Sequence, residues 1–419
     1  MLLAVHNVYP SLRPYTAGFF QLSHYNPETG TYVQGWRDIY FAIGSIIGFT
    51  AARAITIDWI FQPIARAGGL KRKASLRFAE QGWLVVYYGG YWSFGMYLWA
   101  NSNYWLNFNN LWDNWPARDM SGIFKFYLLT QLSFWLQQIL VINIEERRKD
   151  HYQMLTHHFI TSTLLYSAYI YGFFNVANVV LCIMDIVDYM LPVGCTRGVA
   201  NDMVANKPQT AKMLKYMGYE RSCNIAFGVF LGTWLIARHV VYLTLCWSIY
   251  QTIPARLPYG CYNGATSEMY STEGTPDNWG HLLWPFKDLD GSICMNEKVK
   301  IIFLSFLLFL QVLSIIWFTM IVRVAVKVLR TGAAEDSRSD DEGDEGLEEG
   351  GQGQNGTLEK DLGDASADSS GSDPTWRRSV MNNGPSQGNR IRTGRARVRL
   401  SDQSDRKALL GRIGCDKPT

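Results

Sequence analysis

Apolar and polar residues form alternating blocks along this chain, and the apolar blocks have the length needed to cross a lipid bilayer. A hydrocarbon core of about 30 Å requires about 17–25 largely apolar residues in a helix. Seven segments meet this length, at 39–61, 82–100, 123–144, 154–174, 175–191, 223–250 and 301–322. The pattern predicts an all-α polytopic membrane protein with seven spans, in which the fourth and fifth spans form a tight helical hairpin.

The connections between the predicted spans differ in their content of Lys and Arg. Residues 66–77 are basic, whereas 101–121 contain few basic residues and several tryptophans. Lys and Arg collect in the short cytosolic loops of membrane proteins. We therefore expect four lumenal segments: the N-terminal stretch, 101–121, 172–178 and 251–298. The expected cytosolic segments are 66–77, 145–153, 189–221 and the chain after residue 322.

The C-terminal region, residues 331–419, changes in composition to Gly, Ser, Asp, Asn and Arg with few apolar residues. Such a segment cannot bury enough apolar surface to offset the entropy of ordering, so we expect a disordered cytosolic tail. Ser337 and Ser339 are followed by acidic residues, which makes them candidate sites for an acid-directed kinase. A solvated tail without a dedicated partner is the alternative.

The seven cysteines have no CxxC spacing that would indicate a zinc site or a disulfide scaffold. Cys261 and Cys294 both fall in the predicted lumenal connection 251–298. They are the two cysteines that we expect to be able to pair.

Four ionisable residues are predicted to meet inside the fourth and fifth spans. His157 and His158 lie one or two turns inside the cytosolic start of the fourth span, and Asp185 and Asp188 lie near the cytosolic end of the fifth. The aspartates are three residues apart and so share a helix face. Isolated ionisable groups in a bilayer cost a few kcal/mol each and mark functional sites. A carboxylate bonded to one ring nitrogen would suit the imidazole to general-base or nucleophilic catalysis.

Two other interpretations of this cluster are a purely structural polar bridge and a metal site. A membrane di-iron centre needs several groups of histidines, and His6, His24 and His281 lie in the predicted lumenal segments. We therefore expect no metal. Arg238 and His239 stand deep in the sixth span, where they either join the same polar interior or are satisfied by neighbouring helices.

Residues 147–192, which include "HH" and "MDIVDY", and the continuation 211–239 resemble the signature region of the ceramide synthases, the longevity-assurance acyltransferases of the endoplasmic reticulum. "FFQLSHYNPETGTY", "FAEQGW" and "NLWDNWP" are similar to the fungal branch of that family. The resemblance covers roughly residues 10–330. It implies a TLC-type six-helix transmembrane bundle at 75–330, preceded by one span within 1–74. The residues that match the family's catalytic positions are His157, His158, Asp185 and Asp188.

The resemblance also implies the reaction. A ceramide synthase transfers a fatty acyl group from acyl-CoA, its co-substrate, to the amine of a sphingoid base, without a permanently bound cofactor. Arg147, Arg148 and Lys149 are candidate contacts for CoA phosphates, or else ordinary basic residues of a cytosolic loop. The membrane lipid is the expected environment, no nucleic-acid partner is expected, and a dimer or an accessory subunit stays open. The alternative function is a non-catalytic TLC-fold protein, a lipid sensor or a helper of membrane insertion.

Two features depart from the family pattern. The chain begins at "MLLAVHNVYP" as if inside a further span, so we expect it to be truncated at its N-terminus. Residues 193–209 are inserted where the family runs directly from "DY" and a few residues into "AK". They correspond to 51 nucleotides, in frame, that can begin with GT in the codon for Val193 and end with CAG for Gln209. We interpret the insert as a translated intron, with a polar cytosolic loop as the alternative.

Overall fold

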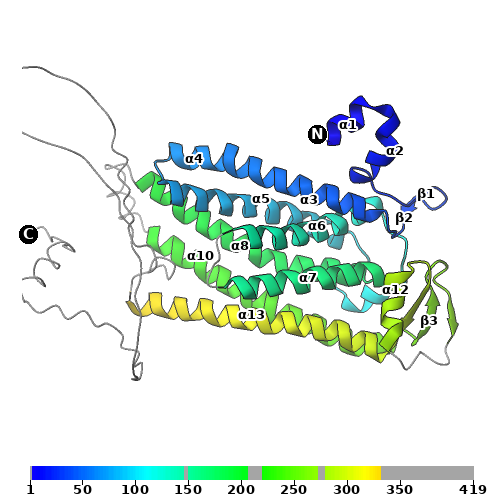
Figure 1. Ribbon diagram of the computed structural model, residues 1–419. Helices are drawn as coiled ribbons and strands as arrows, with labels where there is room; N and C mark the ends of the chain where they lie inside the picture. The colour runs from blue at the N-terminus through cyan, green and yellow to red at the C-terminus, as the bar shows by residue number, and fades with distance from the viewer. Residues whose placement is uncertain (1, 146–149, 206–218, 272–278, 332–419) are drawn as a thin grey trace, which may run out of the picture. The chain divides into compact units, whose positions relative to one another are not determined.

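The computed structural model describes residues 2–145, 150–205, 219–271 and 279–331. Within these ranges the chain runs back and forth in long helices that lie side by side (Figure 1). They are α3 (Asp38–Ile55), continued by η3 (Thr56–Phe61) and α4 (Gln62–Ala67), then α5 (Arg72–Ala100), α6 (Gly122–Ile144), α7 (His151–Tyr171), α8 (Phe174–Ala205), α10 (Tyr219–Trp234), continued by η5 (Leu235–Val241) and α11 (Tyr242–Arg256), and α13 (Glu297–Thr331). Each predicted span falls on one of these helical stretches, which confirms the all-α prediction.

Among the described residues, four helical stretches are long and apolar enough to cross a membrane. These are Asp38–Ala67, Gly122–Ile144, Phe227–Arg256 and Glu297–Arg323. The other three long helices, α5, α7 and α8, mix apolar residues with tyrosine, histidine, asparagine or aspartate and lie alongside these four (Figure 1). The chain is a multi-pass membrane protein.

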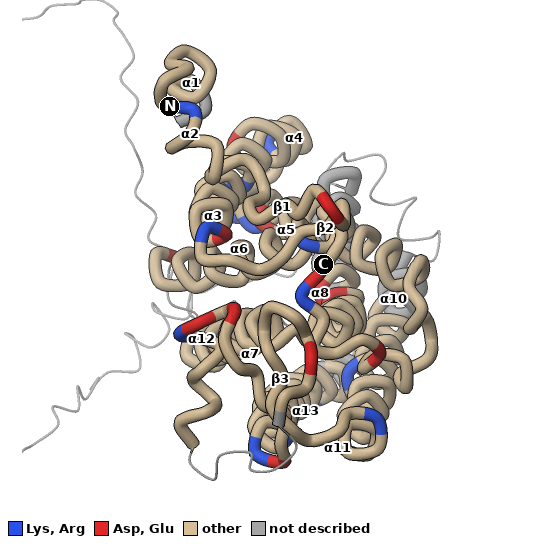
Figure 2. The backbone as a smooth tube through the Cα atoms, turned by 90° about the vertical axis from the view of Figure 1, so that its right-hand side faces the viewer, with Lys and Arg blue, Asp and Glu red and all other residues tan. Residues whose placement is uncertain are grey.

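Six of the helical stretches close into a ring (Figure 2). Around it, α5 packs on α6, α6 on α7, α7 on α13, and α13 on α11, while α10 and η5 pack on α8, and α8 packs back on α5. The first helical stretch lies outside the ring, with α3 against α6 and η3 against α5. This arrangement is the predicted TLC-type six-helix bundle with one preceding helix.

The α7–α8 hairpin depends on a glycine. Gly172 ends α7 with φ of 75°, in the left-handed region that suits glycine. A Cβ at this position would lie 2.8 Å from the carbonyl oxygen of Ala117, so no side chain fits. The turn predicted from the sequence spans 172–178. In the structure it is shorter and consists of Gly172 and Phe173, because α8 begins at Phe174. His157 and Asp188 stand almost equally far from Gly172 along the chain, which puts both about 23 Å from the turn.

The end of the bundle that holds this turn also carries short strands, which the sequence pattern did not predict. β3 (Gly260–Asn263) pairs antiparallel with β4 (Met269–Ser271) and with β5 (Ser292–Met295). The register sets Cys261 opposite Cys294, and a disulfide joins them as expected. The remaining short elements are α1 (Leu2–Val8), η1 (Pro10–Leu12), α2 (Arg13–Thr16), η2 (Ala17–Phe19), β1 (Tyr25–Asn26), β2 (Thr31–Tyr32), η4 (Phe108–Trp112), η6 (Trp279–Leu283) and α12 (Trp284–Lys287).

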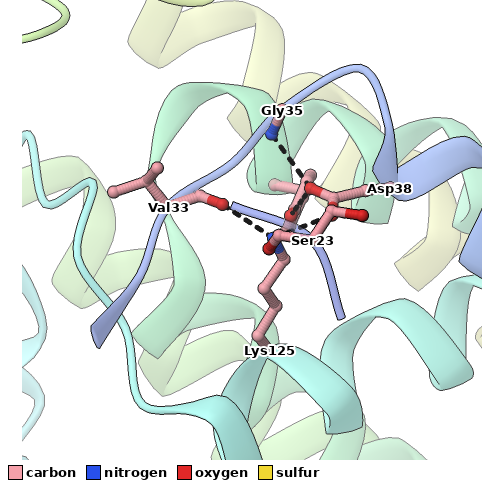
Figure 3. A network of polar contacts seen from close by, with 6 residues as sticks. Ser23, Val33, Gly35, Asp38 and Lys125 are labelled. Carbon is pink, nitrogen blue, oxygen red and sulfur yellow. Dashed lines mark hydrogen bonds and ion pairs between the residues drawn. The ribbon is translucent and has the colours of Figure 1, made fainter. Parts of the chain in front are cut away.

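A buried ion pair ties the segment before α3 to the bundle (Figure 3). The Nζ atom of Lys125, near the start of α6, lies 2.8 Å from Oδ1 of Asp38 and donates to the carbonyl oxygens of Ser23 and Val33. The Oδ2 atom of Asp38 accepts from the hydroxyl of Tyr169 on α7. Lys125 is 0% exposed. The network therefore connects the N-terminal segment, α3, α6 and α7 through charged groups that cannot reach water.

Replacing Lys125 with methionine is expected to destabilise the protein by about 3–5 kcal/mol, because it leaves the Asp38 carboxylate buried without its counterion. Adding Asp38→Asn to Lys125→Met should recover much of that loss. The measurement is thermal unfolding of the purified protein in detergent. Arg53→Met is the matched control, since the Arg53–Glu145 pair is partly exposed and such pairs contribute about 0–1 kcal/mol. Equal effects of the two single changes would contradict the structural role of the Lys125 pair.

Some sequence predictions fall partly or wholly outside the described residues. These are the basic cluster Arg147, Arg148 and Lys149, and the tail with Ser337 and Ser339. The insert 193–209 is described as far as residue 205, where its backbone continues α8 as helix. The expected alternative, a loop that starts at residue 193, therefore differs from the structure, and the intron hypothesis stays a prediction.

Candidate active site

The centre of the helix ring holds a mainly apolar cavity, bounded by residues of α6, α7, α8, η5, α11 and α13. Its polar end is formed by His157, Thr161, Asp188, Arg238 and Ser314. From there it follows α7 and α8 toward Phe173, over 16 residues or about 24 Å along the helix axis. The side chains that line this passage include Leu165, Ala168, Val176, Val180, Leu307 and Phe303.

His157 is placed at the polar end by aromatic rings. Its imidazole packs edge-to-face against Trp135 of α6, with ring centroids 5.6 Å apart, and against Trp317 of α13, at 5.2 Å. The Nδ1 atom of His157 is buried and has no hydrogen-bond partner among the described residues. Packing therefore holds the ring in place without using this ring nitrogen.

Asp188 reaches the same cavity from α8 and is paired with Arg238. Nη2 of Arg238 lies 2.5 Å from Oδ1 of Asp188 and also donates to the carbonyl oxygen of Met184. The guanidinium lies over the ring of Trp234, 4.4 Å from its centroid. Arg238 belongs to η5, a π-helix, a form found frequently at functional sites. The site thus contains an arginine that is 4% exposed and a carboxylate that neutralises it.

The other two predicted site residues, His158 and Asp185, are buried but do not line the cavity. Oδ2 of Asp185 accepts a hydrogen bond of 3.0 Å from Nε2 of Gln131, whose Oε1 accepts from the hydroxyl of Tyr87. His158 packs against Trp135 and against His157. The structure therefore divides the predicted group of four into a pair that lines the cavity and a pair behind it.

The direct bond between a carboxylate and an imidazole that the sequence analysis expected is not formed among the described residues. Asp185 and Asp188 are three positions apart, but Asp185 turns to α6 while Asp188 turns to η5. Nδ1 of His157, Nδ1 of His158 and Oδ1 of Asp185 are buried and have no hydrogen-bond partner among the described residues. A purely structural polar bridge would satisfy such atoms, because most buried polar groups in proteins are hydrogen-bonded. Of these three residues, His157 lines the cavity, where a bound ligand can reach its ring.

The structure also settles the two alternatives for Arg238 and His239. Arg238 joins the polar interior, whereas Nδ1 of His239 lies 2.7 Å from Nε2 of Gln311 on α13 and does not line the cavity. In the part of the chain that the structure describes, no group of three His, Cys, Asp or Glu side chains gathers in a metal-binding arrangement.

The site residues predicted from the sequence did not include Gln131, Tyr87, Thr161 or Ser314. Thr161 follows His157 by four residues, so helical spacing alone would have placed it on the same face. The other three come from helices whose rotation toward the site is set only by packing.

Comparison with known proteins shows the family to which this chain belongs. The model of the TLC domain family matches residues 77–203 and 208–323. A sphingosine N-acyltransferase-like protein of Alternaria alternata is 42% identical over 327 residues, which cover 77% of this chain and 72% of that protein. A ceramide synthase of Gibberella moniliformis is 38% identical over 82% of this chain and 77% of its own length. A sphingosine N-acyltransferase of Schizosaccharomyces pombe is 37% identical over 80% of this chain and 75% of its own length. This chain belongs to the TLC domain family, among its fungal ceramide synthases and sphingosine N-acyltransferases.

Proposed function

We propose that this protein is a sphingoid-base N-acyltransferase, a ceramide synthase that uses fatty acyl-CoA. The observation that carries the proposal is one cavity with His157 and the Asp188–Arg238 pair at one end and an apolar passage behind them. An acyl chain fits the passage, since its burial there is favoured by the hydrophobic effect. Its thioester carbonyl would then meet the imidazole.

The reaction balances without a further reactant. The thioester C–S bond breaks, an amide C–N bond forms to the amine of the sphingoid base, and one proton of that amine ends on the CoA thiol. His157 is proposed as the group that contacts the thioester carbon or the amine proton, either as nucleophile or as general base. His158, Asp185 and Asp188 complete the proposed catalytic set, with Asp188 holding its charge against Arg238.

The proposed membrane arrangement follows the sequence pattern. The protein resides in the endoplasmic reticulum membrane, with the His157 end of the bundle and the C-terminus facing the cytosol. Residues 75–330 form the catalytic domain, 1–74 precede it and 331–419 form a cytosolic tail. Arg147, Arg148 and Lys149, which lie in the sequence between α6 and α7, are proposed contacts for the phosphates of CoA.

Purified protein in detergent is expected to form ceramide from sphinganine and acyl-CoA and to release one CoA for each ceramide. Product is measured by mass spectrometry and free thiol by colorimetry, across a series of acyl lengths. A parallel reaction without sphinganine controls for simple thioester hydrolysis. Absence of ceramide at every acyl length would contradict the proposal and favour the non-catalytic alternative.

A further inference from the structure

Two hydroxyl groups that line the cavity lack the hydrogen bond that many serine and threonine side chains in the helices make. Serine and threonine hydroxyls inside helices commonly bond to the carbonyl oxygen four residues earlier. In the long helices the side chains that do so include Thr50, Ser93, Thr130, Ser133, Thr156, Thr163, Thr244, Ser305 and Thr319. The hydroxyl oxygens of Thr161 and Ser314 make no hydrogen bond with the described residues, and both oxygens are buried.

Both residues line the cavity, from the neighbouring helices α7 and α13. Thr161 is on α7, one helical turn from His157 toward the apolar passage. Ser314 is on α13, one turn from Trp317, whose ring packs against His157. Thr161 therefore stands about one helical turn, roughly 5 Å along the α7 axis, from the histidine at which the reaction is proposed. Ser314 reaches the same end of the cavity from α13.

Buried hydroxyls are hydrogen-bonded with few exceptions. On the side of the passage, the cavity wall next to them is formed by residues such as Leu164, Leu165, Leu310 and Leu307. The polar side chains at the cavity's end, among the described residues, do not hydrogen-bond either hydroxyl. A ligand with an oxygen atom between Thr161 and Ser314 would hydrogen-bond both hydroxyls. A plain hydrocarbon chain would leave both unpaired, and a site built to bond a hydroxyl discriminates against an analogue without one.

We propose that Thr161 and Ser314 form a subsite that recognises an aliphatic hydroxyl group close to the reacting carbon of the lipid substrate. The inference rests on the proposed acyltransferase function. Two substrates can supply this hydroxyl: a sphingoid base, which carries hydroxyls next to its amine, or an acyl chain hydroxylated beside the thioester. The chemistry is the same in both cases, since Thr161 and Ser314 can each donate and accept.

The test compares kcat/KM for substrate pairs that differ by one hydroxyl. One arm uses sphinganine against its 1-deoxy and 3-deoxy analogues with an unsubstituted acyl-CoA. The other arm uses a 2-hydroxyacyl-CoA against the unsubstituted acyl-CoA with sphinganine. The unaltered protein should prefer the hydroxylated member of one pair by about tenfold or more. Thr161→Val combined with Ser314→Ala should bring that ratio to about one, and the arm in which this happens identifies the substrate.

Ser162→Ala is the matched control, since Ser162 is also on α7 with a buried, unpaired hydroxyl but does not line the cavity. Its ratio should equal that of the unaltered protein, and Thr161→Ser, which keeps the hydroxyl, should retain the preference. Each single variant is measured as well. The readout is the ratio of two kcat/KM values, which does not depend on the amount of folded protein. Unchanged ratios in both arms, or an equal loss in Ser162→Ala, would overturn the subsite. Absence of ceramide from the unaltered protein would instead contradict the proposed function itself.

Discussion

Replacing His157 with alanine is expected to lower ceramide formation by about 10²–10⁴-fold while the protein still folds. A general base or nucleophile contributes rate enhancements of this size, and alanine is the residue best tolerated in a helix. His157 lines the cavity, and its Nδ1 has no hydrogen-bond partner among the described residues, so its loss removes the imidazole that faces the cavity. The measurement is specific activity of purified protein, set against its thermal unfolding in detergent.

His239→Ala is the matched control, since His239 also stands within the bundle but bonds Gln311 and does not line the cavity. It should keep most of the activity. His158→Ala is expected to be nearly inactive as well, because His158 and His157 pack against the same ring of Trp135. Near-normal turnover of His157→Ala would remove that residue from the proposed mechanism.

Breaking the Asp188–Arg238 pair is expected to reduce both activity and stability. Asp188→Asn leaves the arginine buried without a counterion, and removing one partner of a buried ion pair costs about 3–5 kcal/mol. Arg238→Met should have a similar effect by leaving the carboxylate alone. The double variant Asp188→Asn with Arg238→Met buries no charge at this place, so its unfolding temperature should recover while its activity stays low.

The exposed pair of Arg256 with Asp113, at 4.0 Å, provides the control for this experiment. Arg256→Met should change stability by about 0–1 kcal/mol and leave turnover unchanged. A double variant at Asp188 and Arg238 that regains both stability and activity would show that the pair is only structural. Activity that falls strictly in step with folded protein in all variants would lead to the same conclusion.

Much of the fold follows from the chain's pattern of apolar lengths and turn residues. Helical spans are set by apolar length, and a glycine at residue 172 marks where α7 must stop and reverse. The level of a residue in a helix follows from counting residues from the helix end, so the sequence predicted a similar level for His157 and Asp188. Their nearly equal separations from Gly172 agree with this prediction. The pairing of Cys261 with Cys294 followed from their shared connection.

Counting residues along the chain gives neither the rotation of each helix about its axis nor the helices that pack against it. Asp185 and Asp188 share a face in the sequence pattern, yet one bonds Gln131 of α6 and the other Arg238 of η5, because two different helices pack on either side of α8. The strands β3, β4 and β5 were missed because each is only three or four residues long and gains its partners from distant segments. The sequence by itself determined the helical spans, the hairpin and the depth of the four ionisable residues. Only the packing of six helices around one cavity decided which of these four residues line the cavity, since contact between helices depends on rotation and neighbours that no local pattern specifies.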